Sequence, residues 1–149
     1  MSVPTPDLTK QPPRSPRVRL GGYALLPRML DKGRALLAGK NGEYHYNCPN
    51  DEHFLDFAGI DPEALKQQLA AGKGDGEILD WVNANAKHKR EDVEIAAWSA
   101  YIERLAPDNP ESRAYFNELH KKAGVERSDI VSWADLLDLD DYVSFGGKA

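Results

Sequence analysis

The segment from Gly42 to Asp51 gathers most of the chemically versatile side chains that lie close together in this sequence. Its letters, GEYHYNCPND, include the only cysteine of the 149-residue chain, one of four histidines and two of six tyrosines. Glycine and proline bound the segment, and loops of this kind often display binding and catalytic groups on a rigid scaffold. We therefore predict a pocket near the Tyr44–Cys48 loop.

Cys48 and His45 have the residue types of a nucleophile and its base. A thiol attacks as the thiolate, which a nearby base or a helix N-terminus favours. The proline directly after Cys48 gives no local activation, and no cysteine-protease signature surrounds it. A structural cysteine that behaves as a small hydrophobe is therefore the alternative. If the site carries out chemistry, Asp31 or His45 is the predicted acid–base group.

Four potential metal ligands lie within nine positions, namely His45, Cys48, Asp51 and His53. A zinc site needs such groups to converge on one point. Their spacing is not that of a standard zinc finger, and Asp51 has a simpler role as the cap of a following helix. We therefore predict no metal site and leave any cofactor unknown. A metal-dependent enzyme that uses His45, Cys48 and Asp51 is kept only as a third hypothesis.

Arg14, Arg17 and Arg28 could bind an anion together with Tyr44. A guanidinium group holds a carboxylate or phosphate through paired N–H donors. The alternative is that the same arginines form ion pairs with the acidic run at 138–141. Such pairs would tie the two ends of the chain together.

Asp31 has an arginine three positions away on each side, Arg28 and Arg34. This spacing on a helix predicts a salt-bridged carboxylate at the surface. A role as general base would instead require burial of the carboxylate.

Short helices must position these groups. Apolar residues spaced by three and four positions, with capping residues, proline and glycine between the runs, predict them. The predicted helices cover residues 27–38, about 51–58, 61–71, 75–86, 91–105 and 110–123, with a last one capped by Ser128 or Asp129 that ends at Leu137. The predicted fold class is therefore all-α, a compact single domain of about six or seven short helices with at most one small β-hairpin near Glu43–Asn47.

We predict an extended proline-rich arm at 1–13, a single helical domain at 14–145 and a mobile tail at 146–149.

Composition and charge limit the class of protein. Hydrophobic residues make up 41% of the chain and the formal net charge is −5. Acids and bases are mixed, whereas nucleic-acid binding needs clustered Lys and Arg. Neither a signal peptide nor an apolar run near the ~20 residues of a membrane span is present. We therefore expect a cytoplasmic protein without nucleic-acid or membrane partners.

Short motifs spread along the chain carry a family resemblance. They lie at residues 8–10, 13–16, 20–23, 30–32, 42–44, 48–49, 56–60, 98 and 137–141. With these motifs the chain resembles the bacterial domain-of-unknown-function family number 5069 over nearly its whole length. The resemblance implies no particular activity. It adds weight to Arg14, Asp31, Tyr44 and Cys48, which lie in the motif segments, and not to His53, which lies outside them.

The leading hypothesis is a small helical protein that binds or converts a small anionic or polar metabolite near the Tyr44–Cys48 loop. Arg14 and Arg17 would hold the ligand, with Tyr44 and Cys48 beside it. A second hypothesis is a non-enzymatic homodimeric interaction module, because the arm and the amphipathic acidic tail could each dock on a neighbouring chain.

Overall fold

The computed structural model of the protein describes residues 3–124 and 127–148. These residues form seven α-helices, which confirms the predicted all-α class. The helices are α1 (Leu26–Leu37), α2 (Pro49–Ala58), α3 (Pro62–Ala70), α4 (Asp75–Asn85), α5 (Asp92–Arg104), α6 (Pro110–Lys122) and α7 (Trp133–Ser144). The only β pairing among the described residues is an isolated bridge between Leu20 and Tyr23, and residues 43–47 form turns rather than a hairpin.

Parts of the predicted arm and tail, residues 1–2 and 149, lie outside the described residues. Among the helices that are described, none has both the length and the apolar character needed to cross a membrane.

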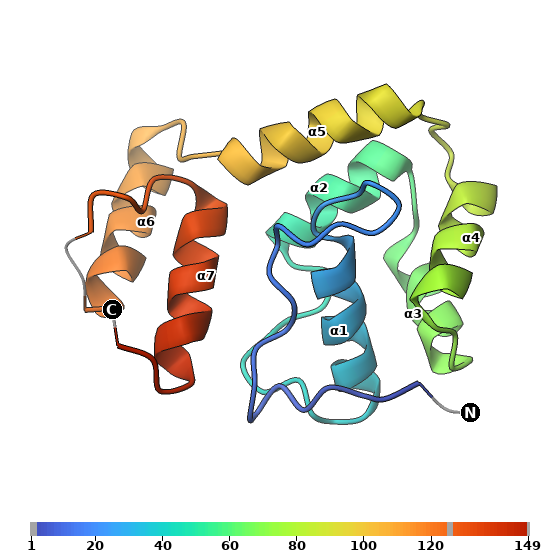
Figure 1. Ribbon diagram of the computed structural model, residues 1–149, viewed down its shortest axis with the longest axis horizontal. Helices are drawn as coiled ribbons and strands as arrows, with labels where there is room; N and C mark the ends of the chain where they lie inside the picture. The colour runs from blue at the N-terminus through green and yellow to red at the C-terminus, as the bar shows by residue number, and fades with distance from the viewer. Residues whose placement is uncertain (1–2, 125–126, 149) are drawn as a thin grey trace.

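Helix α1 lies at the centre of the molecule. Helices α3 and α4 lie on one side of it and the α6–α7 pair lies on the other, while α2 lies above it, under α5, which runs across both parts (Figure 1). The first ten residues of α1 are all buried. A helix enclosed in this way buries its polar residues too, and buried charges need partners. The prediction of a surface position for Asp31 is therefore wrong, since this residue is only 8% exposed.

The main hydrophobic core lies between α1 and helices α2 to α4. Phe54 of α2 is fully buried, and its ring meets Tyr23 edge-on with the ring centroids 5.2 Å apart. Trp98 of α5 stacks on Phe57 of α2 with a centroid distance of 4.7 Å. Buried aromatic rings contribute both apolar area and specific edge and stacking contacts. These ring contacts therefore join α5 to the same hydrophobic core that packs on α1.

Local capping signals begin two of the predicted helices. Asp61 accepts a hydrogen bond from the backbone N–H of Ala64 at the start of α3, at 2.9 Å. Asn109 does the same for Ser112 at the start of α6, at 2.8 Å. A proline occupies the first turn after each cap, where its missing N–H has no helical partner to lose.

The last helix differs from the prediction. It begins at Trp133 rather than near Ser128 or Asp129, and it runs on to Ser144 instead of ending at Leu137. Ser132 caps it by accepting a hydrogen bond from the backbone N–H of Asp135. The run of acids after Leu137 is helical because its apolar residues, such as the buried Leu139, pack at helical spacing while the acids find basic partners.

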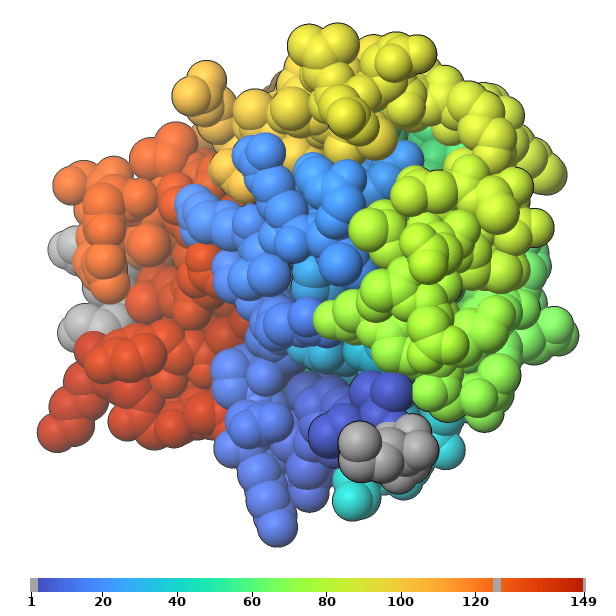
Figure 2. Space-filling view, turned by 45° about the vertical axis from the view of Figure 1, so that its right-hand side comes forward, coloured from blue at the N-terminus to red at the C-terminus, as the bar shows by residue number. Residues whose placement is uncertain are grey.

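The described part of the N-terminal arm packs on the rest of the chain. Leu8 is only 1% exposed, and its backbone N–H donates to the carbonyl oxygen of Lys40 at 2.9 Å. Figure 2 shows the N-terminal segment, in blue, filling the surface between the red α7 and the green α4. This path brings Arg14 within reach of α4 and Arg17 within reach of α7.

Gly42 permits the close approach of the arm to the loop that carries Tyr44. Its φ is +55°, and a Cβ at this position would lie 2.9 Å from the carbonyl oxygen of Leu8. We expect Gly42→Ala to destabilise the fold by about 2–4 kcal/mol through left-handed strain and overpacking, measured by urea unfolding. Gly39→Ala is the matched control, because Gly39 has a φ of +69° but open space around it. We expect a loss of about 1–2 kcal/mol there, and equal losses in the two variants would contradict a close packing of the arm.

Candidate functional site

Arg28 and Asp141 form a buried ion pair between α1 and α7. Their side chains are 6% and 8% exposed, and Arg28 Nη1 lies 2.7 Å from Asp141 Oδ2. The Tyr44 hydroxyl donates to the other carboxylate oxygen at 2.7 Å, and the guanidinium lies 5.5 Å from the centre of the Tyr44 ring. Burial, together with the hydrogen bond to Asp141, raises the pKa of Tyr44. Tyr44 is therefore a neutral donor that helps to hold α7 on α1.

Lys32, Asp51 and Cys48 form a second buried cluster between α1 and α2. Lys32 Nζ lies 2.9 and 3.0 Å from the two Asp51 carboxylate oxygens and 3.2 Å from Cys48 Sγ. The Lys32 and Asp51 side chains are 4% and 2% exposed. The ammonium group thus donates its hydrogen bonds to Asp51, in the first turn of α2, and to Cys48, the N-cap residue of that helix.

Helix α2 begins three residues earlier than a cap at Asp51 would place it. Cys48 is the N-cap residue and Pro49 the first helical residue. Asp51 accepts a hydrogen bond from the backbone N–H of Cys48 at 3.2 Å. The carboxylate predicted to cap the helix from outside therefore lies in its first turn, where it also faces the helix dipole.

Arg14 joins two carboxylates on different helices. It contacts Asp31 of α1 at 3.0 Å and Asp75 of α4 at 2.7 Å, and its backbone N–H also donates to Asp31. Arg34 of α1 contacts the same Asp75 at 2.8 Å. The partner of Asp31 is therefore Arg14, seventeen positions away, and not the arginines three positions away on its own helix.

Arg17 holds the start of the chain against α7. It contacts Asp138 at 2.6 Å and also pairs with Asp135. Together with the pair between Arg28 and Asp141, this contact confirms for Arg17 and Arg28 the alternative in which the arginines pair with the acidic tail. Arg14 pairs with Asp31 and Asp75 instead. The two ends of the chain are joined by charge pairs that the sequence separates by more than a hundred positions.

Acid should weaken this attachment. Burial alone would raise the pKa of Asp135, but hydrogen bonds from the backbone N–H groups of Ser132 and Val131, and from Arg17, lower it to about 2. Because the unfolded value is about 3.9, the ionised carboxylate stabilises the fold above that pH, and the contribution disappears as the pH falls through the folded value. We expect a loss on the order of 1–2 kcal/mol between about pH 4 and pH 2, measured by urea unfolding. The loss should shrink in Asp135→Asn and persist in Asp80→Asn; equal profiles would contradict this prediction.

A cleft runs between the α6–α7 pair and the loop that precedes α2. Its larger part has a volume of about 720 Å³ and adjoins a more apolar part of about 370 Å³. Six residues, from the loop before α2 and from helices α2, α6 and α7, line both parts of the cleft. The shared residues are Cys48, Asn50, Tyr115, Leu119, Leu137 and Asp140. Each part by itself lies in the size range of small-molecule sites.

The structure brings only half of the predicted site residues together. Tyr44, His45 and Cys48 line the larger part of the cleft. The other three, Arg14, Arg17 and Asp31, are not among the residues that line it and are engaged in the ion pairs described above.

The cleft also contains residues outside the six of the predicted site. Arg28 and Lys32 form part of its floor, and Asp140 lines both of its parts. Tyr115 and Trp133 line the more apolar part and lie 6.4 Å apart. Burial and the neighbouring charge of Asp141 raise the pKa of Asp140. The helical spacing of α7 was the only signal for Asp140, and it was not recognised because the helix was predicted to end at Leu137, before this position.

The predicted metal-ligand types do not gather into a metal site. Among the described residues, no group of three or more His, Cys, Asp or Glu side chains is arranged to hold a metal ion. Asp51 turns toward Lys32, and His53 faces the more apolar part of the cleft, which His45 does not line. The hypothesis of a metal enzyme built on His45, Cys48 and Asp51 therefore has no geometric support.

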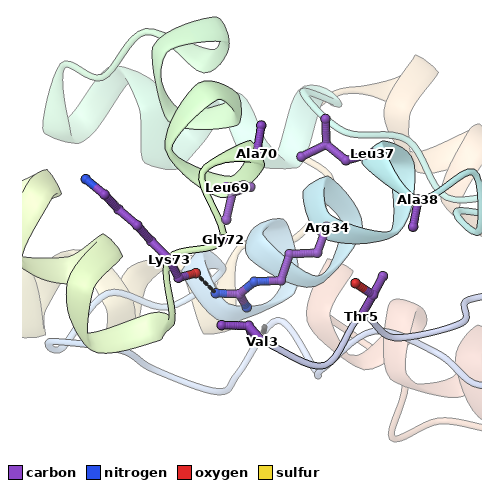
Figure 3. Close-up of a pocket in the computed structure, with 9 residues that line it drawn as sticks. All are labelled: Val3, Thr5, Arg34, Leu37, Ala38, Leu69, Ala70, Gly72 and Lys73. Atoms are coloured by element: carbon purple, nitrogen blue, oxygen red, sulfur yellow. Dashed lines mark hydrogen bonds between the residues drawn. The ribbon is translucent and has the colours of Figure 1, made fainter. Parts of the chain in front are cut away.

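A smaller pocket of about 250 Å³ lies at the far end of α1. Figure 3 shows Arg34 crossing it toward the carbonyl oxygen of Lys73, to which it donates at 3.2 Å, with Val3 and Thr5 of the arm on one side. The Arg34 guanidinium is also paired with Asp75. Because no residue of the Tyr44–Cys48 loop lines this pocket, the larger cleft is the better candidate site.

One protein-family model matches residues 10–143 of the chain. The matched region includes helices α1 to α6, nearly all of α7, and the loop that lines the cleft. The family is described as a domain of unknown function. No curated protein matches the sequence. The match extends over most of the chain, as the resemblance of its motifs predicts, and the protein therefore belongs to the family of domains of unknown function DUF5069.

Proposed function

We propose that the protein binds a small polar metabolite with an apolar portion in the cleft between the α6–α7 pair and the Tyr44–Cys48 loop. The observation that carries this proposal is that the cleft joins hydrogen-bonding groups at one end to an aromatic wall at the other. Tyr44 and His45 lie at the polar end and Trp133 at the apolar end, while Cys48 and Tyr115 line both parts. Ligand sites combine these features, a mostly apolar lining with a few placed polar groups.

The charges of the cleft favour a polar ligand over an anionic one. Arg28 and Lys32 are the cations of the lining, and each already has a carboxylate within 3 Å, at 2.7 and 2.9 Å. Two further acids, Glu43 and Asp140, also line the larger part. A site with this balance does not attract a phosphate or carboxylate strongly, whereas hydroxyl or amine donors of a ligand can bond to Asp140.

The apolar end of the cleft would shield the apolar portion of the ligand from water. Tyr115 is 57% exposed although its ring lies beside Trp133. Leu119 and Leu137 complete this wall. Covering such a surface contributes about 25 cal/mol per Å² of apolar area removed from water. We therefore expect ligands with an aliphatic or aromatic part to bind better than fully polar ones of the same size.

If the ligand is also converted, His45 is the better acid–base candidate than Asp31. His45 is exposed and lines the cleft. Both carboxylate oxygens of Asp31 accept hydrogen bonds from Arg14. An acid–base group must reach the proton that it transfers, and Asp31 has no place in the cleft from which to do so.

The homodimer hypothesis loses its original motivation. It assumed that the arm and the acidic tail were free to dock on a second chain. The described part of the arm packs on its own chain through Leu8, and the acidic tail pairs with Arg17 and Arg28 of the same chain through Asp138 and Asp141. We therefore do not propose an interaction module.

A thermal-shift screen of neutral and amine-bearing metabolites tests the binding proposal. Binding to the native state raises the melting temperature in proportion to RT ln(1 + [L]/Kd). For a compound that raises it, we expect Asp140→Asn to weaken binding about tenfold, measured by calorimetry, because a charged hydrogen bond contributes about 1.5–3 kcal/mol. Asp140 is exposed, so the fold should tolerate this change.

Asp80→Asn, on the exposed surface of α4, is the matched control and should leave the affinity unchanged. Equal affinities of wild type and Asp140→Asn, or a ligand that binds equally after Tyr115→Ala, would place the ligand elsewhere and remove the proposal.

A further inference from the structure

We propose that Cys48 and Lys32 form an oxidative modification site. Hydrogen peroxide would oxidise Cys48 to a sulfenic acid, and the Lys32 amine would capture it as a sulfur–nitrogen cross-link between α2 and α1. This inference does not depend on the binding proposal.

The geometry places the two reacting atoms in contact. Lys32 Nζ lies 3.2 Å from Cys48 Sγ, which is within the range of a reactive approach. Lys32 is 3% exposed, and its contacts with Asp51 hold the amine in place. A freely rotating surface lysine would meet the sulfur only rarely, whereas this one has little freedom to leave it.

The chain offers no thiol to resolve the oxidised sulfur. Cys48 is its single cysteine, so a sulfenic acid cannot form a disulfide within the molecule. A sulfenic acid without a thiol partner can condense with a nitrogen nucleophile to give a sulfenamide. The nitrogen in contact with Cys48 is that of Lys32. Capture by the amine would also protect the sulfur from further, irreversible oxidation.

The atoms and charges of the reaction balance within the cluster. In the first step the thiol and one peroxide molecule give the sulfenic acid and water. In the second step the Lys32 ammonium passes a proton to Asp51, 2.9 Å away, and the free amine attacks the sulfur. The S–N bond forms as the S–O bond breaks, and the leaving hydroxide takes the second amine proton to form water. Asp51 ends as a neutral acid beside a neutral sulfenamide, so no charge is left buried without a partner.

The sulfur is reachable by a small oxidant. Cys48 is partly exposed and lines both parts of the cleft, whereas Lys32 lines only the larger part and is just 3% exposed. Peroxide can therefore reach Sγ from the cleft while the amine stays shielded from solvent. This arrangement favours oxidation first and capture second.

Mass spectrometry of the peroxide-treated native protein tests the proposal. After digestion we expect the peptides that contain Lys32 and Cys48 to be joined with a net loss of two hydrogens, and a thiol reductant should separate them. The same treatment of the wild type in urea is the main control, because it needs no variant that folds. The cross-linked fraction should fall by about tenfold or more there, since unfolding removes the fixed contact.

Two variants extend the test. Cys48→Ser should give no cross-link, and Lys32→Arg should instead accumulate sulfenic and sulfinic acid on Cys48 in the native protein. The proposal is overturned if the native wild type yields only those acids, only a disulfide between two chains, a link that retains an added oxygen, or the same cross-linked fraction as the unfolded chain.

Discussion

Asp141→Asn is expected to destabilise the protein by about 3–5 kcal/mol, because it leaves the Arg28 guanidinium buried without its countercharge. The two side chains are 6% and 8% exposed, so water cannot take over the role of the carboxylate. Asparagine keeps the size of the side chain and can still accept the hydrogen bond from Tyr44. Urea unfolding followed by circular dichroism measures the loss.

The control for Asp141→Asn is a variant that breaks an ion pair between a carboxylate and a cation at the surface. Glu118 and Lys122 lie 3.7 Å apart on α6 with side chains that are 64% and 71% exposed. We expect Glu118→Gln to change the stability by about 0.5 kcal/mol or less. A loss below about 1 kcal/mol in Asp141→Asn would mean that the buried pair does not hold α7 on α1 in solution.

Asp51→Asn is expected to cost a similar amount, about 3–5 kcal/mol, because it leaves the Lys32 ammonium group buried without a carboxylate. The Asp51 and Lys32 side chains are 2% and 4% exposed, so this pair is buried even more completely than the first. Glu52→Gln, an exposed acid in the same helical turn, should cost about 0.3–1 kcal/mol through the helix dipole alone.

The double variant Lys32→Met, Asp51→Leu separates the cost of an unpaired charge from the value of the pair. Replacing both partners of a buried ion pair with apolar groups is often close to neutral. We therefore expect it to be more stable than Asp51→Asn by about 2 kcal/mol or more. A double variant no more stable than Asp51→Asn would show that packing, rather than charge, sets the cost at this site.

Local signals account for the parts of the fold that the sequence predicted well. Asp61 and Asn109 cap their helices through hydrogen bonds to residues three positions further on. Both the donor and the acceptor lie in one short stretch of sequence, so the pattern contains the whole interaction. The Tyr44–Cys48 loop was recognised as the cleft-lining segment for a similar reason, since its side-chain types and its boundaries are local properties.

Neighbouring acids on α7 show what the sequence left open. Asp138 and Asp141 are three positions apart and therefore share the face that meets Arg17 and Arg28. Asp140, one position from Asp141, points to the cleft instead. Helical geometry separates such neighbours by about 100° around the axis. Their different roles could not be predicted until the helix was known to continue past Leu137.

The sequence by itself determined an all-α fold, most of its helix starts, the family, and the loop that lines the cleft, because each of these depends on residues close together along the chain. Only the tertiary structure decided that α1 is enclosed, that Asp31 pairs with Arg14, and that Arg14 and Arg17 lie outside the cleft. A charged residue on a helix looks the same in sequence whether it faces water or a countercharge. Its partner is chosen by elements distant in the chain, and that choice becomes visible only when the helices are packed together.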